Sequence, residues 1–555
     1  MGPEILSERR MSADIPRGTR SRHAQERSSA ERTDSLNLMG GPRSSQWAET
    51  IHARCRAQLF EASLGESATA SRCLRGGVDL LTRDFAANAE QRSPVADSAV
   101  SRPLACHPIE QHVASVDPRP DRASICRRSD KAMEDGPGQQ DAIREVLAAI
   151  DLSAPPEAGV AKPLINLGLG DPSVFGNMPP APESIAAIEE SLKSGRALGY
   201  PESVGYPDAR LAVANYFDEG PNGNWRITAG DVVMTHGASG ALEMAISVLA
   251  EEGKNVLFPK PLFTAYETMS AVANCEIRYY DLLPEQNWEV DIPHLESLID
   301  ENTAFVMLNN PSNPCGSNWS AEHLRAIAAV MNRHQVVVIS DEVYAGLAWS
   351  VTGPTPAAAS EPRIEGKFNR GVFTPYASIC GSAPCLVVGA ISKRWLAPGH
   401  RLGWIVVHDP QGVLVNVRQG LGKWAFRVQG PTSIMQRALP AILANTKESF
   451  YLDTMAELER VGKALFERLS RIPGLKPYLP QGAMYLICRY EGLDFANDKE
   501  FVTALHKEER VFILPGACFR LDGFIRFVTT TPLPVLLDAC ERLEAFCTRH
   551  RKSVA

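Results

Sequence analysis

The sequence of 555 residues has no long apolar run and no excess of positive charge. No run approaches the roughly 18 apolar residues of a membrane-spanning helix, so we expect no membrane partner. Its 65 acidic residues outnumber its 57 lysines and arginines, which leaves a formal net charge of −8. This balance offers no general attraction to nucleic acid, and a small anionic ligand would have to be held by local arginines.

Paired cysteines are also lacking. The 12 cysteines are scattered, without a CxxC pair or a metal-ligand spacing. This pattern indicates the reduced thiols of an intracellular protein, so we expect neither a disulfide framework nor a metal site. Acidic residues begin at Glu4 and no apolar h-region follows, which makes the N-terminus a poor targeting peptide. We predict a cytoplasmic protein, with a degraded mitochondrial signal as the alternative.

Residues 1–136 have few aromatic side chains, namely Trp47, Phe60 and Phe85. A segment so poor in large apolar residues cannot bury enough surface to offset the entropy lost on ordering, so we predict a disordered extension. It shows neither a helix-turn-helix pattern nor a strongly basic face, which argues against a DNA-binding module.

Beyond this extension, short β-branched runs alternate with longer helical periods. Strands are predicted over residues 231–236, 255–258, 304–308 and 336–340, and helices over residues 239–251 and 321–334. Such alternation predicts an α/β fold with a mainly parallel sheet between helices. We divide the chain into an N-terminal arm at 137–177, a large domain at 178–430 and a smaller α+β C-terminal domain at 431–555. A Pro-, Ala- and Gly-rich stretch at 348–379 is predicted to be a surface loop insertion.

One lysine follows an apolar strand in a turn of small residues, within the sequence VVGAISKRWLAPGHRLGW at 387–404. Desolvation at such a place lowers the pKa of an amine, which makes Lys393 a candidate nucleophile that can form a Schiff base. Arg401 lies where the returning chain could bring a guanidinium to a phosphate. Asp341 follows the predicted strand at 336–340, and a carboxylate there could keep a pyridine nitrogen protonated.

With these residues the chain resembles the fold-type I, pyridoxal-phosphate-dependent aminotransferases, and most of all their tyrosine aminotransferase branch. The matching segments keep the family's order across roughly 140–550, and they are DPSVFGN at 171–177, NNPSNPCG at 309–316, DEVY at 341–344, the lysine segment and GAMYL at 482–486. The resemblance implies pyridoxal 5'-phosphate as the cofactor, a homodimer, and amino acid and 2-oxo acid substrates.

The resemblance also assigns roles to single residues. Lys393, Asp341 and Tyr344 would be catalytic, and Arg526 would bind the substrate's α-carboxylate with help from the backbone of Gly170. The further residues expected at the cofactor are Asn313 at the ring oxygen, Phe263 stacked on the ring, Ala238, Ser239 and Arg401 at the phosphate, Ser392 beside the lysine, and Tyr200, which in relatives reaches the phosphate bound by the neighbouring subunit.

Two positions depart from the family pattern. Ala390 stands where many relatives have a phosphate-binding serine, and His400 replaces a tryptophan beside Arg401. Neither change removes the expected catalytic residues.

The expected reaction moves the amino group of tyrosine, or of another aromatic amino acid, to 2-oxoglutarate, giving an aryl pyruvate and glutamate. A broad alanine- or methionine-type aminotransferase and a carbon–sulfur lyase on the same fold stay open as alternatives. So does a regulator that binds the cofactor without turnover. Arg427 is a candidate partner for the side-chain carboxylate of glutamate, with a surface charge as the alternative.

Overall fold

The computed structural model describes residues 162–220, 223–351 and 372–552, together with Ile143, Val146 and Ile150. These residues all belong to the unit Trp47–Ala555. The predicted extension at 1–136 lies outside the described residues, as does most of 137–161. The domain boundaries therefore stay predictions.

The large sheet has eight strands and supplies most of the core. Across the sheet their order is β2 (Val232–Thr235), β9 (Gly403–His408), β8 (Cys385–Ala390), β7 (Val337–Asp341), β6 (Thr303–Asn309), β3 (Asn255–Lys260), β4 (Glu276–Leu283) and β5 (Glu289–Val290). The pairs from β8 through β4 are parallel. The remaining pairs, at the two edges, are antiparallel.

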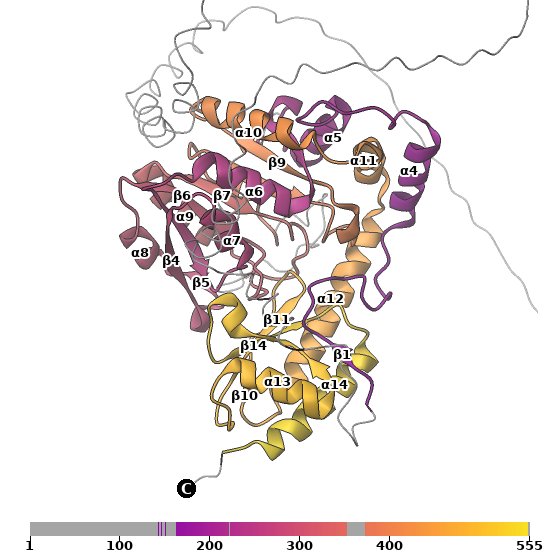
Figure 1. The fold of residues 1–555 in the computed structure, drawn as a ribbon, viewed down its shortest axis with the longest axis vertical. Coiled ribbons are helices and arrows are strands. Elements are labelled where there is room, and N and C mark those ends of the chain that lie inside the picture. Colours follow the sequence, from indigo (N-terminus) through magenta and orange to yellow (C-terminus); the bar gives the residue numbers. More distant parts are fainter. Residues whose placement is uncertain are drawn as a thin grey trace, which may run out of the picture. The chain divides into compact units, whose positions relative to one another are not determined.

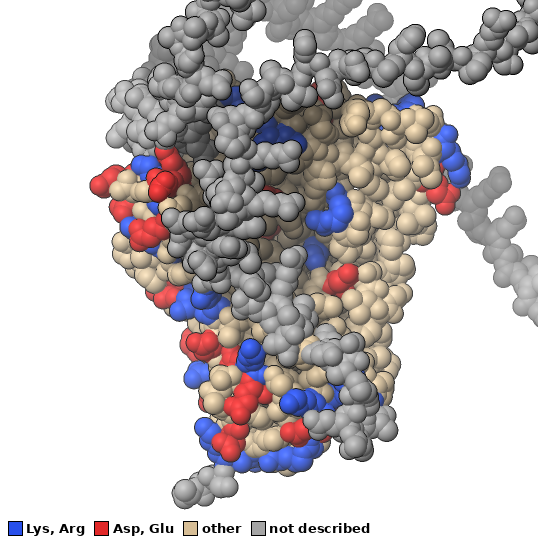
Figure 2. Space-filling model, viewed as in Figure 1, with Lys and Arg blue, Asp and Glu red and all other residues tan. Residues whose placement is uncertain are grey.

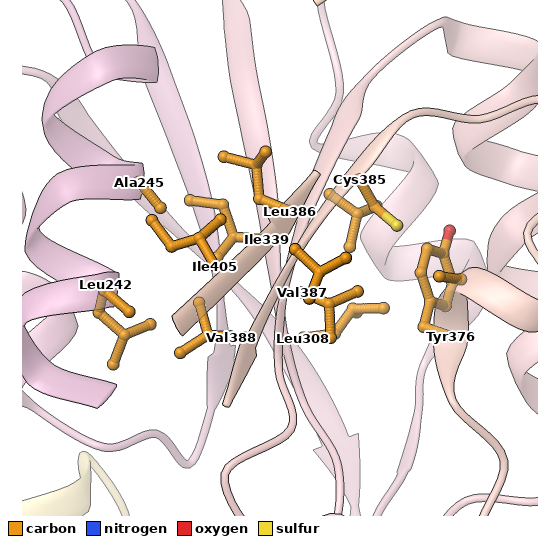
Figure 3. Packing of buried hydrophobic residues seen from close by; sticks show 14 of the residues in the cluster. Leu242, Ala245, Leu308, Ile339, Tyr376, Cys385, Leu386, Val387, Val388 and Ile405 are labelled. Atoms are coloured by element: carbon orange, nitrogen blue, oxygen red, sulfur yellow. The ribbon is translucent and has the colours of Figure 1, made fainter. Parts of the chain in front are cut away.

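Side chains alternate between the two faces of this sheet, as the period of two along a strand requires. On one face, Leu386 and Val388 of β8 lie toward Leu242 and Ala245 of helix α6 (Gly237–Leu249) (Figure 3). On the other face, Cys385 and Val387 lie toward Tyr376 (Figure 3). Both faces are therefore apolar, which explains why the central strands read as continuous apolar runs.

Helices cover the sheet as the sequence pattern predicts. Helix α9 (Ala321–His334) begins at Ser320, whose hydroxyl accepts a hydrogen bond from the His323 amide, and buries Leu324, Ile327 and Met331. The other helices of this part are α4 (Pro182–Lys193), α5 (Pro207–Phe217), α7 (Ala265–Ala271), α8 (Ile292–Ser297), α10 (Val415–Val428) and α11 (Ser433–Asn445). The predicted α/β class is confirmed.

A second, antiparallel sheet follows in the C-terminal part. Its strand order is β10 (Leu475–Pro477), β11 (Tyr485–Tyr490), β14 (Phe524–Val528) and β13 (Leu514–Pro515). Helices α12 (Glu448–Leu469), α13 (Asp498–Glu509) and α14 (Leu533–Arg549) lie around it (Figure 1). A separate short parallel pair joins β1 (Ile165–Asn166) to β12 (Val511–Phe512), which ties the N-terminal arm to the C-terminal part.

The stretch at 348–379 differs from the expected surface loop at both of its ends. Trp349, Phe373 and Tyr376 are buried, and Tyr376 begins a short 3-10 helix, Tyr376–Ser378. Burying these large aromatic side chains stabilises the fold, and a loop on the surface could not bury them. The prediction of a surface loop was therefore wrong for the two ends of this stretch. Its middle, 352–371, lies outside the described residues.

The cysteines in the described part of the chain are all free thiols. No helix among the described residues combines the length and the apolar character needed to cross a membrane. On the face in Figure 2, the visible lysines and arginines are interspersed with aspartates and glutamates among the described residues, rather than forming one basic patch.

Glu342 is a buried carboxyl just beyond β7. Its Oε1 accepts hydrogen bonds from the Tyr376 amide at 2.8 Å and the Ser340 hydroxyl at 2.9 Å. Burial nevertheless raises the pKa of Glu342 to about 8. Because its pKa rises from 4.5 to about 8 on folding, ionisation of this carboxyl destabilises the folded protein progressively as the pH rises from about 4.5 to about 8.

We therefore expect Glu342→Gln, which keeps the acceptor oxygen and cannot ionise, to be more thermostable than the wild type above pH 8. The difference in melting temperature should grow between about pH 5 and pH 8 and level off above pH 8. The control is Glu243→Gln on the exposed face of α6, which should give a difference that does not change with pH. A pH-independent difference for Glu342→Gln would contradict the burial of a titrating carboxyl.

Candidate active site

A cavity of about 250 Å³ lies where the ends of strands from both sheets meet the N-terminus of α6. Open α/β sheets bind ligands at the carboxyl ends of their parallel strands, and β6 and β7 end here. Of the site residues expected from the sequence, those that line this cavity are Gly170, Ala238, Ser239, Phe263, Asn313, Asp341, Tyr344, Ser392, Lys393, Arg401 and Arg526. Tyr200 is not among the lining residues.

Asp341 is the last residue of β7 and only 3% of its surface is exposed. Burial raises the pKa of Asp341 to about 6, against the opposing effects of two hydrogen bonds and of the nearby Lys393 charge. One hydrogen bond comes from the Tyr266 hydroxyl at 2.6 Å and the other from the Val343 amide at 3.2 Å. The carboxylate is thus held in one orientation, with Tyr266 as its strongest partner.

Lys393 lies in the turn that follows β8, and Ile391 and Leu396 hold that turn by backbone hydrogen bonds. Its Nζ donates to the carbonyl of Gly170 and lies 5.9 Å from the centre of the Tyr344 ring. The amine is therefore enclosed between the N-terminal arm and the segment that follows β7, with the Asp341 carboxylate near enough for the two charges to interact.

The opposite end of the cavity is suited to an anion. Arg401 has a left-handed backbone (φ +50°) and donates to the carbonyls of Pro398 at 3.0 Å and His236 at 3.2 Å. A Cβ at Gly237 would lie 2.7 Å from a guanidinium nitrogen, so only glycine lets Arg401 approach the first turn of α6. The backbone amides of Ala238 and Ser239 in that turn add the partial positive charge of a helix N-terminus.

Arg526 is buried on β14 and faces the same cavity. Its guanidinium donates to the side-chain oxygen of Asn313 at 2.8 Å and to the carbonyl of Gly168. Its buried Nε has no hydrogen-bond partner among the described residues. Because Arg526 occupies the oxygen of Asn313, the amide nitrogen of Asn313 is the group left to donate to a ligand.

Two buried tyrosines form a pair at the wall of the cavity. The Tyr344 and Tyr485 hydroxyls are hydrogen-bonded at 2.7 Å, and the two rings pack edge to face. Burial, followed by the influence of Tyr485, raises the pKa of Tyr344 well above its ordinary value. The Tyr344 phenol therefore keeps its proton in the physiological range.

Sequence reasoning assigned no role to Tyr266 or Tyr485, although Tyr485 lies in the GAMYL segment at 482–486. The signal for Tyr266 was weak, since it is one more aromatic residue three positions after Phe263. Arg427, the candidate partner for a second carboxylate, is exposed on α10 near the Trp424 ring and is not among the lining residues of its own chain.

A family model described as "Aminotransferase class I and II" matches residues 162–543. The chain belongs to this family. It is 41% identical over 395 residues to a tyrosine aminotransferase of Mus musculus, an alignment that covers 70% of this chain and 82% of the mouse protein. It is 34% identical over 399 residues to nicotianamine aminotransferase 1 of Oryza sativa subsp. japonica, which covers 70% of this chain and 76% of the rice protein.

A solved structure agrees with this family. The tyrosine aminotransferase of Leishmania infantum superposes with a TM-score of 0.66 at 29% identity, covering 75% of this chain and 98% of that chain. Class I and II aminotransferases use pyridoxal 5'-phosphate, and this chain is a pyridoxal-phosphate-dependent aminotransferase of that kind.

The residues present fit this cofactor. The cavity has a carboxylate for a protonated ring nitrogen, a lysine for a carbonyl, and an arginine beside a helix N-terminus for a phosphate. Ala390 has no side-chain hydroxyl, so a bound phosphate would be left to Arg401, Ser239 and the backbone of α6. His400 lies in the turn that leads to Arg401. Burial lowers the pKa of the His400 imidazole, so His400 adds no positive charge near neutral pH.

Tyr266→Phe removes the hydroxyl that donates to Asp341. We expect the pKa of Asp341 to rise from about 6 by about one unit, because a hydrogen bond to a charged group contributes roughly 1.5–3 kcal/mol and one pKa unit corresponds to about 1.4 kcal/mol. An ionised carboxylate attracts the protonated ring, so cofactor affinity should rise with pH through this pKa. The midpoint of this rise in cofactor affinity should therefore lie at a higher pH in Tyr266→Phe than in the wild type.

The measurement is the dissociation constant of pyridoxal phosphate for the cofactor-free protein between pH 5 and pH 8. Tyr280→Phe is the matched control, because Tyr280 is equally buried but donates to the Met307 carbonyl at 2.6 Å. Superimposable profiles for wild type and Tyr266→Phe would show that Tyr266 does not set the charge of Asp341.

Proposed function

We propose that this aminotransferase moves the amino group of tyrosine, or of another aromatic amino acid, to 2-oxoglutarate, as in the breakdown of aromatic amino acids. The observation that carries the proposal is the lining of the cavity. Arg526 can pair with an α-carboxylate, while Ile143, Leu169 and Leu514 offer apolar surface to a side chain. The similarity to the mouse tyrosine aminotransferase supports the same donor.

In this proposal the two arginines of the cavity bind different anions, Arg401 the phosphate and Arg526 the α-carboxylate. Among the described lining residues, Arg401 and Arg526 are the arginines, and Arg401 lies at the phosphate end. A bidentate guanidinium suits the planar α-carboxylate that both substrates carry. An aromatic donor needs no further charge for its side chain, which fits the apolar surface of Ile143, Leu169 and Leu514.

Bound pyridoxal phosphate supplies a carbonyl that condenses with amines and a ring that accepts an electron pair. Lys393 would hold the cofactor through Nζ and, as a free amine, would take the proton from the substrate Cα as a general base. Asp341 would keep the ring nitrogen protonated, and Tyr344 would donate to the ring oxygen. Arg526 would hold the carboxylate so that the Cα proton faces Lys393.

Tyrosine or phenylalanine should convert the bound cofactor to its pyridoxamine form in a half-reaction, and 2-oxoglutarate should restore it. We expect ping-pong kinetics, because both substrates use the same Arg526 in turn. The measurement is the cofactor absorption in single turnover, followed by a screen of donors and acceptors. Alanine or methionine as the best donor would instead favour the broad aminotransferase.

A different result would favour the carbon–sulfur lyase alternative. If tyrosine gave no pyridoxamine form while cystathionine released pyruvate and ammonia catalytically, the transaminase proposal would be wrong.

We also propose that the enzyme is a homodimer whose sites are shared. Tyr200 is 89% exposed and Leu198 beside it is 90% exposed, although both are large and apolar. Tyr200 lies outside the cavity of its own chain, so in this proposal it meets the phosphate of a second copy. A surface of this kind around the loop after α4 is suited to contact between copies.

Complementation tests the shared site. Lys393→Ala should be inactive, because no other lining residue can both hold the cofactor and carry the proton. Tyr200→Ala should bind pyridoxal phosphate weakly. Co-expression of the two chains should restore about a quarter of wild-type activity, since half of the dimers are mixed and each has one intact site. No recovery from a purified mixed dimer would contradict a contribution of Tyr200 across the interface.

A further inference from the structure

Tyr485 connects two parts of the site that the mechanism treats separately. It begins β11, where it pairs with Val528, while Arg526 on β14 pairs with Ile487. Residues two apart on one strand share a face, so Tyr485 and Arg526 are diagonal neighbours on the same side of the small sheet. The Arg526 guanidinium carbon lies 4.3 Å from the centre of the Tyr485 ring.

The hydroxyl of Tyr485 points away from Arg526's strand to Tyr344, which follows β7 of the large sheet. The two phenolic oxygens are 2.7 Å apart. A Cβ at Gly170 would lie 2.3 Å from the Tyr485 hydroxyl, so the glycine leaves the space that this hydroxyl fills. The hydroxyl is thus enclosed between Tyr344 and the backbone of the N-terminal arm.

Either hydroxyl could donate in this contact. The pair holds two phenolic protons, and one of them makes the hydrogen bond between the two oxygens. If Tyr485 donates, the proton of Tyr344 is left to face the cavity, on the side where Lys393 lies 5.9 Å from the Tyr344 ring. If Tyr344 donated instead, its proton would be occupied inside the pair.

We propose that Tyr485 is a positioning residue that donates its hydroxyl proton to Tyr344 and so keeps the Tyr344 proton aimed at the cofactor's ring oxygen. Its ring, at the same time, supports the carboxylate-binding Arg526. The inference rests on the proposed role of Tyr344, and the experiment separates the two.

The readout is the pH at which the visible absorption of the bound cofactor changes. A donor at the ring oxygen favours the anion and lowers this pH, so losing the donor raises it. Tyr344→Phe should raise it by about one to two units, and Tyr485→Phe by roughly half a unit, because the Tyr344 donor then remains but is no longer oriented. Tyr485→Phe keeps the ring, so KM for both substrates should stay near the wild-type value.

A double variant decides whether Tyr485 acts through Tyr344. Tyr344→Phe combined with Tyr485→Phe should titrate like Tyr344→Phe alone, whereas two independent effects would add. The matched control is Tyr490→Phe, at the other end of β11, which loses only a hydrogen bond to Asp498 and should leave the titration unchanged.

One more variant completes the test. Tyr485→Leu removes the ring as well and should in addition raise KM for both substrates several-fold. An unshifted transition in Tyr485→Phe, with a shifted one in Tyr344→Phe, would overturn the inference. An unshifted transition in Tyr344→Phe would refute the role of Tyr344 itself, and an additive double variant would show that Tyr485 does not act through it.

Discussion

The site depends on keeping one carboxylate charged in the interior. Asp341 ends a strand that lies between β6 and β8, and burial alone would favour its neutral form. The hydrogen bond from Tyr266, the Val343 amide and the nearby Lys393 all oppose that tendency. A protonated cofactor ring would add the opposite charge that this arrangement is built to meet. The carboxylate and its ligand therefore stabilise one another, which couples cofactor binding to the state of Asp341.

Around that carboxylate, the two sheets contribute different functions. The large sheet and α6 carry Asp341, Lys393 and the turn beside Arg401, all of which line the cavity. The small sheet carries Arg526 and Tyr485, which line the same cavity. The contact of Tyr344 with Tyr485 and that of Asn313 with Arg526 join the two groups. A shift of the small sheet would therefore change substrate binding and the donors at the ring oxygen together.

The sequence predicted the parts of this site that short segments encode. Lys393 and Arg401 belong to one turn, and the strand before Asp341 is plain from its β-branched residues. The roles of Tyr266 and Tyr485 could not be predicted, because their hydrogen-bond partners lie 75 and 141 residues away in the sequence. Periodicity carries no information about such contacts. The same reason explains the error at 348–379, where a Pro- and Gly-rich composition concealed aromatic side chains that pack into the core. The alternation of strands and helices sufficed for the α/β class, but not for the antiparallel β9 between β2 and β8.

The arm residues show why glycine can be a binding residue. A Cβ at Gly168 would lie 2.6 Å from the Phe512 ring, and one at Gly170 would lie 2.3 Å from the Tyr485 hydroxyl. Both positions are therefore open only to glycine unless the rings move. With no side chains in the way, the carbonyls of Gly168 and Gly170 reach Arg526 and Lys393 respectively. The arm thus orients two of the cations that line the cavity through its backbone, and a residue larger than glycine would disturb both Arg526 and Lys393.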